Sequence, residues 1–470
     1  MPRTIEDLPP ELICSVLEEL APSTEPYSEA DALDWLQTYS AFKHDELAST
    51  QDIAACALVC RTWHEIALPL LFHTLRLQVT PEGRGKGLGD ALTWLKTVPW
   101  ICSCVKDVHF MVPMAEAFAS DLPDDDSQYY NLVLLCDVLQ MFPRLQEVAM
   151  QDILLKPYAS QAVAPPKHAL NLNRFSFIFR HRSPFDMCVT DLLCLFPWLG
   201  SVKRVSLQRL FGVRPSLPLV KAPIELHIES LDLSSVTCIH SLTQLLVSTP
   251  SFRIHGLRSL SLNLNAIPGR FDEGDIVEFL TLVAPRLEEF HCNVGWFIAR
   301  ESPMSSLVRS WKLHSDSALH PLSLAARRDI RLDLSGFVAL KKLRLMFYAI
   351  GDFKDEENRA DMLAVANILS TLVENQSLIG SYSLVEDITL SLVLDDWLHD
   401  PGRRDPGKYL ASTCAVELIR IQDVVTRLSM VKRFRIARHG HRTRVFGEED
   451  QAALKSAFPM LEERGVLFIN

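Results

Sequence analysis

A six-residue pattern of apolar residues recurs along most of the chain and limits the folds that the chain can adopt. In this pattern, written h-x-x-h-x-h, apolar residues occupy positions one, four and six. The eleven copies begin at Phe72, Val105, Leu145, Leu172, Val202, Ile228, Leu257, Leu287, Leu340, Val385 and Val431. Since alternate residues of a strand point to opposite faces, each copy predicts a short strand. Positions one, four and six face a core in such a strand, and positions three and five face away from it.

Stretches with helical periodicity precede several copies of the pattern, and a proline often follows the helix. The predicted helices are Leu132–Met141, Leu192–Phe196, Leu242–Val247, Ile276–Val283, Met362–Leu372 and Val416–Leu428. One unit of helix, turn and strand cannot bury its own apolar face, whereas stacked units share a continuous core. We therefore predict an α/β solenoid over 72–470, with parallel strands on the concave face, helices on the convex face and a C-terminal cap from about residue 459. A generic α/β domain with a parallel sheet is the alternative fold.

The N-terminal part of the chain has helical periodicity instead. Over residues 8–20, one face of a helix would carry Leu12, Ile13, Val16, Leu17 and Leu20, with Pro9 near its start. Residues 52–72 predict a second helix that is apolar on two faces, one with Ile53 and Cys60 and the other with Val59 and Trp63. A helix with two apolar faces needs cover on two sides, so we expect a partner protein to supply part of that cover.

The same N-terminal segments resemble the F-box motif. The resemblance rests on Leu8-Pro9-Pro10-Glu11-Leu12 with Val16 and Leu17, and on Ala57-Leu58-Val59-Cys60-Arg61 with Trp63. It implies a small helical domain over 1–75 that docks on a Skp-type adaptor of a cullin-RING ubiquitin ligase, with 21–51 as an insertion. The adaptor-binding residues that it implies are Leu8, Pro9, Leu12, Ile13, Val16, Leu17, Leu20, Ile53, Leu58, Val59, Cys60 and Trp63. The array that follows resembles degenerate leucine-rich repeats, which are common after an F-box.

Composition and motifs exclude several classes of function. A net charge of −11 and a pI of about 5.8 argue against nucleic-acid binding. No apolar run approaches the roughly 20 residues of a membrane helix, and no signal peptide is evident, so we expect the cytoplasm or the nucleus. The 11 cysteines lack zinc-site spacing, and the glycine-rich stretch 83–89 lacks the spacing of a phosphate-binding loop. We expect no enzyme activity, no cofactor and no metal.

Basic side chains gather in the last copies of the pattern. Positions three and five contribute Lys342, Arg344, Arg433 and Arg435, and Arg438 follows. Arginine clusters suit acidic or phosphorylated peptides, so these five residues are the predicted target-binding site. A solvated basic face is the alternative interpretation, and Asp387 between the two basic segments favours it.

These observations lead to one hypothesis and one alternative. The hypothesis is a non-catalytic substrate-recognition subunit of a Skp–cullin–F-box ubiquitin ligase, which docks through its N-terminal helices and binds a protein substrate through its repeats. The alternative is a repeat scaffold or adaptor that is not dedicated to ubiquitination. The identity of the protein substrate cannot be read from the repeats.

Overall fold

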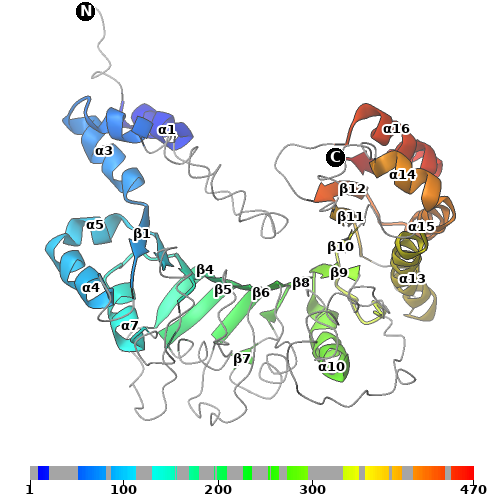
Figure 1. The fold of residues 1–470 in the computed structure, drawn as a ribbon, viewed down its shortest axis with the longest axis horizontal. Helices are drawn as coiled ribbons and strands as arrows, with labels where there is room; N and C mark the ends of the chain where they lie inside the picture. Colours follow the sequence, from blue (N-terminus) through cyan, green and yellow to red (C-terminus); the bar gives the residue numbers. More distant parts are fainter. Residues whose placement is uncertain are drawn as a thin grey trace, which may run out of the picture. The chain divides into compact units, whose positions relative to one another are not determined.

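The computed structural model describes residues 9–20, 51–80, 86–112, 130–153, 155, 169–178, 195, 198–208, 226–234, 252–253, 256–263, 273–294, 332–348, 355–379, 384–393, 406–439 and 446–470. The chain divides into two compact units, Met1–Gly256 and Leu257–Asn470. Each unit is built on an open parallel sheet with helices beside it (Figure 1).

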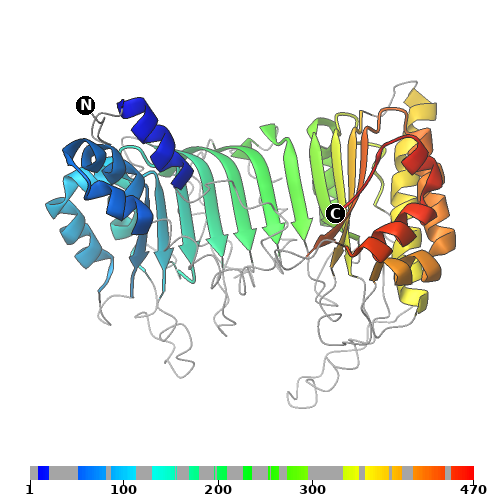
Figure 2. The same ribbon diagram turned by 90° about the horizontal axis from the view of Figure 1, so that it is seen from above.

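The strands of each unit follow one another in chain order and are parallel. The first unit contains β1 Thr74–Gln78, β2 Asp107–Met111, β3 Glu147–Gln151, β4 Leu170–Ile178, β5 Leu199–Gln208, β6 Leu226–Ser234 and the two-residue β7 Phe252–Arg253 beside β6. Figure 2 shows the cyan-to-green strands of this unit side by side, pointing the same way. The second unit contains β8 Ser259–Asn263, β9 Glu289–Asn293, β10 Lys342–Tyr348, β11 Asp387–Val393, β12 Arg433–His439 and β13 Leu467–Ile469.

All eleven predicted strands are confirmed, and within each unit they pair with their six-residue patterns aligned. Position three of one copy faces position three of the next, as in Thr74 with Asp107 and Asp387 with Arg433. Positions four and six are buried on one face, as Val108, Phe110 and Leu345 show. The pattern thus predicts the strands and also their register, because a shift by one residue would place the apolar positions on the wrong face.

A repeated hydrogen bond fixes this register. In many adjacent strand pairs, the carbonyl at position two accepts bonds from the amides at positions two and three of the following copy. Lys341 and Lys342 donate to the Glu288 carbonyl over 2.8 and 2.9 Å, and Glu386 and Asp387 donate to the Lys341 carbonyl over 2.8 and 3.1 Å. The same contact joins the first three strands, through the carbonyls of His73 and Lys106. Because the acceptor is at the same pattern position in each of these copies, it sets the register of the strand that follows.

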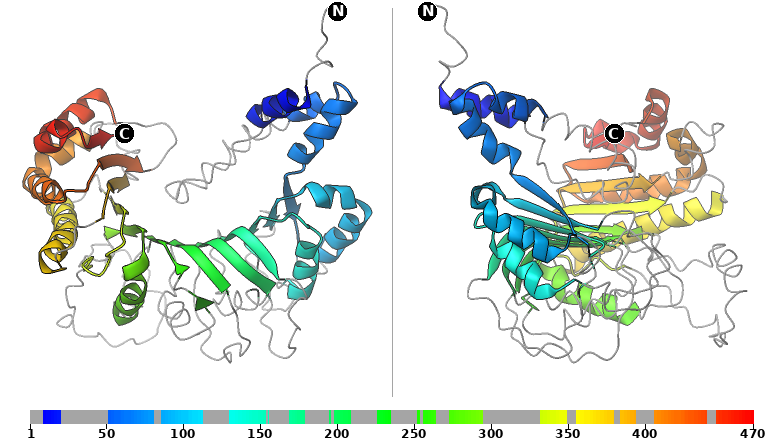
Figure 3. Two further views of the ribbon diagram at one scale, coloured as in Figure 1. Left: turned by 180° about the vertical axis from the view of Figure 1, so that it is seen from behind. Right: turned by 60° about the vertical axis from the view of Figure 1, so that its left-hand side comes forward.

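Helices lie along the buried-core face of the strands (Figure 1, Figure 3). The helices described beside the first sheet are α4 Leu88–Thr97, α5 Pro99–Cys104 and α7 Leu132–Gln140. Those of the second unit are α10 Glu273–Val283, the 3-10 turn η6 Ala284–Arg286, α13 Asp355–Ile379, α14 Pro406–Thr413, α15 Ala415–Arg427, α16 Glu448–Ala457 and α17 Pro459–Glu463. Four of the six predicted helices correspond to α7, α10, α13 and α15; Leu192–Phe196, apart from Leu195, and Leu242–Val247 lie outside the described residues.

The N-terminal region is a three-helix unit, and here the prediction of one helix over 52–72 is wrong. The structure has α1 Pro10–Leu20, a helix over 51–57 and α3 Arg61–Leu71. The break occurs because Cys60 is extended, with φ −159° and ψ 175°, and caps α3. The turn before it is closed by bonds from Leu58 to the Ala55 carbonyl and from Val59 to the Cys56 carbonyl, both 3.1 Å. Breaking the helix allows α3 to pack against the other two helices.

Candidate protein-interaction surfaces

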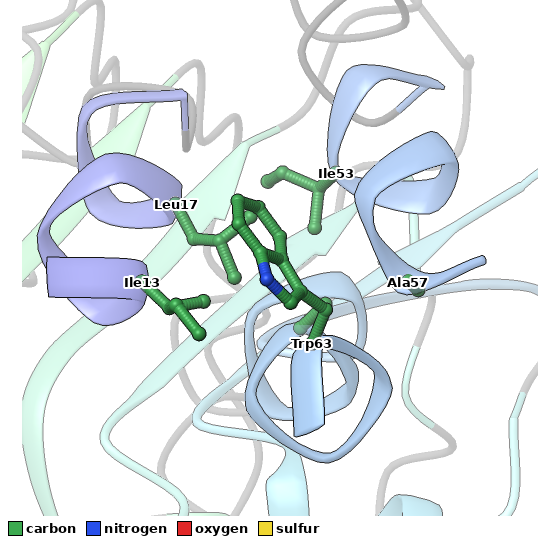
Figure 4. Close-up of a cluster of buried hydrophobic side chains, with 6 residues drawn as sticks. Ile13, Leu17, Ile53, Ala57 and Trp63 are labelled. Atoms are coloured by element: carbon green, nitrogen blue, oxygen red, sulfur yellow. The ribbon is translucent and has the colours of Figure 1, made fainter. Parts of the chain in front are cut away.

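The three N-terminal helices close on a small apolar core of their own. Its buried side chains are Ile13, Leu17, Ile53, Ala57, Trp63 and Ala67. Figure 4 shows the Trp63 indole at the centre, with Ile13 and Leu17 from α1 on one side and Ile53 from the helix over 51–57 on the other. These six side chains are therefore buried in the chain by itself, while the Trp63 Nε1 is buried without an acceptor among the described residues.

Outside this core, four large apolar side chains are exposed to solvent in the part of the unit that the structure describes. Leu12 and Val16 on α1 are 52% and 45% exposed, and Leu58 and Val59 in the turn are 85% and 43% exposed. We call these four residues the exposed apolar residues of the helical unit. A leucine that is almost fully exposed in a turn held by two backbone hydrogen bonds is available to insert into a partner.

The residues predicted to bind the adaptor separate into two groups in the structure. Ile13, Leu17, Ile53 and Trp63 lie in the interior, and Cys60 packs against it in part. Pro9 is exposed together with the four exposed apolar residues. Leu8 and the side chain of Leu20 lie outside the described residues. We therefore expect the interior residues to support docking by holding the helices together.

Two consecutive residues, Phe72 and His73, join the helical unit to the first sheet. The rings of Phe72 and Trp100 meet edge to face, with centroids 5.2 Å apart. The His73 Nδ1 lies 3.1 Å from an Asp107 carboxylate oxygen, and the His73 carbonyl accepts the amides of Lys106 and Asp107. These contacts fix the direction in which α3 leaves the sheet.

The face of each sheet opposite the helices carries polar rows, because positions three and five of successive copies align. In the first unit, row five is formed by Arg76, His109, Ala149, Ser176, Ser206 and Asp232. Its members bond to neighbours on the same face: Ser206 donates to Asp232 over 2.9 Å, and Arg174 of row three donates to Ser176 over 3.2 Å. Polar side chains of this row therefore form hydrogen bonds with neighbours on the same face of the sheet.

His109 in this row makes the stability of the first unit depend on pH. The pKa of His109 is lowered from 6.5 to about 4, mainly by burial and also by the nearby Arg76 and Arg174 cations, while Asp107 raises it in part. Between those pH values the unfolded state binds more protons, so stability falls as the pH drops from 6.5 to 4. We expect His109→Asn to remove about 1–3 kcal/mol of this loss, measured by urea unfolding of both proteins across that range. Parallel pH profiles for the two proteins would contradict the assignment.

In the second unit, rows two and three alternate in charge. Row two is formed by Arg258, Glu288, Lys341, Glu386 and Lys432, and row three by Ser259, Glu289, Lys342, Asp387 and Arg433. Ion pairs cross the strands, from Lys341 to Glu288 at 2.7 Å, from Lys432 to Glu386 at 3.0 Å, and from Lys342 to Glu289. The hydrogen bond from Lys341 lowers the pKa of Glu288.

The five residues predicted as the basic target site are not equivalent in the structure. Lys342 is paired with Glu289, and Arg433 with Asp387 at 3.0 Å. Arg344 and Arg435 lie in row five, on either side of Thr389. Arg438 aligns with the buried Leu392, so strand alternation places its side chain on the face opposite that of Arg435.

Within the described residues, no other constellation suggests chemistry. Three or more metal-binding side chains do not cluster anywhere in this part of the chain. None of its helices has the length and apolar character needed to cross a membrane. At the end of the glycine-rich stretch, the Gly87 amide donates to the Asp90 carboxylate over 3.0 Å, so a carboxylate already occupies the start of α4.

Comparison with known proteins identifies the helical unit. Residues 5–78 match the F-box-like family, and this range includes α1, the helix over 51–57, α3 and β1. The N-terminal part of the chain is therefore an F-box-like domain, a class of non-catalytic module that binds Skp-type adaptors. None of the curated proteins that were compared matches the chain significantly.

Proposed function

We propose that this chain is the substrate-recognition subunit of a Skp–cullin–F-box ubiquitin ligase. Its F-box-like domain would dock on a Skp-type adaptor, and through the adaptor on a cullin. Its parallel sheets, with the polar rows turned away from the helices, would bind the target protein. The chain contributes no chemistry in this proposal and raises the effective concentration of the target near the ligase.

One observation carries the proposal: the F-box-like domain has a buried core of its own and still exposes Leu12, Val16, Leu58 and Val59. These four large apolar side chains lie outside the buried core, and burying them against a partner would release water from each. The Phe72–Trp100 contact then holds the docked domain against the first sheet.

Leu58→Asp should abolish capture of a Skp-type adaptor by the purified full chain. A charge in place of the most exposed leucine should cost about 2–4 kcal/mol, or roughly 30-fold to 1000-fold in affinity. Val416→Asp on α15 is the matched control, because Val416 is 59% exposed but belongs to the second unit. The affinity can be measured by biolayer interferometry, with circular dichroism to check the fold. Undiminished capture by both Leu58→Asp and Leu12→Asp would overturn the docking surface.

The same variant separates the proposal from its alternative, a repeat scaffold that is not dedicated to ubiquitination. In cells, proteins bound to the wild-type chain should accumulate when Leu58→Asp replaces it, because docking is lost while target binding is kept. A scaffold would bind the same proteins without changing their abundance.

A further inference from the structure

A hydrogen-bonded turn leads from helix to strand in several copies of the six-residue pattern. In this turn, the amide of pattern position one donates to the carbonyl three residues earlier. Leu287 donates to Ala284 over 3.3 Å, and Val431 donates to Leu428, also over 3.3 Å. The two residues between donor and acceptor are exposed in both turns, and they form the tip of the turn at the edge of the sheet where the strands begin.

The exposed residues at this edge change from charged to apolar along the second unit. Arg286 is exposed in the turn before β9. The later copies expose large apolar side chains instead, which are Val338 before β10, Leu384 before β11, Met430 before β12 and Met460 before β13, all between 37% and 47% exposed. We call these four residues the apolar edge.

Strand register places the apolar edge along one line. The paired strands β11 and β12 are aligned by their six-residue patterns, and Leu384 and Met430 each directly precede position one of their copy. Neighbouring strands are about 4.8 Å apart, which brings these two side chains within contact range. Val338 precedes the neighbouring strand on one side, and Met460 precedes the neighbouring strand on the other. A contiguous set of exposed apolar side chains indicates a contact surface.

Alternating charges border the apolar edge on the sheet. Lys341, Glu386 and Lys432 occupy position two in three successive strands. Lys432 and Glu386 lie 3.0 Å apart, and their side chains are still 64% and 44% exposed. A partner of one charge would meet a like charge at every second strand, whereas a partner with charges alternating in the opposite order would meet none. A second copy of this edge, turned end for end, carries its charges in that order.

We propose that the apolar edge joins two copies of this chain in a two-fold symmetric dimer. Such a contact uses the same surface on both chains, so each pairing occurs twice. An axis between β11 and β12 places Leu384 of one copy on Met430 of the other, and Val338 of one copy on Met460 of the other. Methionine side chains are flexible and polarisable, so the two methionines can fill the space between the edges.

The same axis also pairs the bordering charges. Glu386 of one copy lies beside Lys432 of the other, and the two ion pairs within the chains join into one group of four charges that alternate in sign. The contact involves the second unit alone, so it does not rest on the proposed docking of the F-box-like domain.

Sedimentation velocity of the purified full chain tests the dimer. We expect the wild-type chain to shift from monomer to dimer between about 1 and 100 µM, since a contact of this size is weak. Leu384→Asp with Met430→Asp should raise the dissociation constant about tenfold or more, because the contact would bury carboxylates against each other. A wild-type chain that stays monomeric throughout this range would overturn the dimer and leave the apolar edge to a different protein.

Val416→Asp with Ile419→Asp is the matched control. Both residues are exposed on α15 of the same unit, so this variant gains the same two charges. They lie in the first half of α15, whereas Met430 follows its last turn, so at least about 12 Å of helix separates them from the apolar edge. Dimerisation should be kept in this control, and circular dichroism should show that both double variants are folded. An equal effect of the two double variants on dimerisation would overturn the assignment of the contact to the apolar edge.

Charge exchange between chains tests the two-fold pairing. Glu386→Lys and Lys432→Glu should each weaken dimerisation a few-fold, since each variant alone places like charges together across the axis. An equimolar mixture of the two variants should restore dimerisation, because the new lysine of one chain faces the new glutamate of the other. A mixture that dimerises no better than either variant alone would contradict this axis.

Discussion

Replacing Trp63 by alanine is expected to unfold the F-box-like domain while the parallel sheets stay folded. The indole is the largest of the six buried side chains described in this core, and it lies among all three helices of the domain. Truncating a buried tryptophan typically costs about 3–5 kcal/mol, which is a large part of what such a small core can provide. The loss should therefore be cooperative within the domain.

Hydrogen–deuterium exchange resolved by segment is the measurement. In Trp63→Ala, the amides of α1 and of the helix over 51–57 should exchange at rates close to those of an unfolded chain, and those of β4 and β5 should stay protected. Leu58→Ala is the control, because it removes a side chain that is 85% exposed and should leave exchange unchanged. Preserved protection of α1 in Trp63→Ala would show that the core does not depend on the indole.

These two residues also show how far the sequence could predict the docking surface. Trp63 and Leu58 belong to the same short motif, and a resemblance to the F-box assigns both to adaptor binding without separating core from surface. Helical periodicity places Leu12 and Ile13 on one face of α1, although one is half exposed and the other is buried. Which of these side chains is buried depends on where α3 packs against α1. The turn at Leu58–Cys60 decides this, and periodicity alone does not reveal the turn.

The strands were predictable because two independent requirements coincide in the six-residue pattern. Alternation fixes which side chains face the helices, and the conserved spacing inside each copy fixes which backbone groups meet in the next strand. Four described helices, α7, α10, α13 and α15, were predicted from helical periodicity, but the bounds of α13 extend well beyond the predicted Met362–Leu372. The first of these extra turns is held by α14, since Asn358 donates to the Tyr409 hydroxyl over 3.1 Å and Arg359 to the Thr413 carbonyl over 2.8 Å. Local periodicity does not reveal such tertiary contacts.

The basic cluster was predicted from its five cations, with Asp387 as the observation against it, and it stays a prediction. Glu289 and Asp387 occupy the same pattern position as Lys342 and Arg433, so aligning the copies already places opposite charges side by side. Counting along the strand would also have removed Arg438, since it lies three residues after Arg435 and therefore on the other face. That the Arg435 Nε is buried without an acceptor among the described residues could be found only from the structure.

Gly407→Ala is expected to have the largest effect on the C-terminal part of the second unit. Gly407 is the second residue of α14, and its amide donates to the buried Asp450 carboxylate of α16 over 2.8 Å; the Lys408 amide donates to the same oxygen over 3.0 Å. A methyl group at Gly407 would lie 2.7 Å from the Asp450 Cβ and 2.9 Å from the Asp450 carbonyl oxygen. Because one of these atoms is backbone, the clash can be relieved only by separating the two helices.

Separating α14 from α16 would also break both charge-assisted hydrogen bonds, so we expect a loss of about 3 kcal/mol or more in the stability of this region. Gly89→Ala provides a matched control, since Gly89 is likewise the second residue of a helix, α4, and no atom lies within 4 Å of the added methyl group. That substitution should stabilise α4 by about 0.5–1 kcal/mol, because alanine loses less backbone entropy on entering a helix. Segment-resolved hydrogen exchange in increasing urea measures both effects, with α14 and α16 reporting on the first and α4 on the second. Equal protection of α14 in wild type and Gly407→Ala would mean that α14 is not held by Asp450. A loss of stability at Gly407 together with a gain at Gly89 would show that the close approach of α16, and not the glycine itself, determines the effect of the substitution.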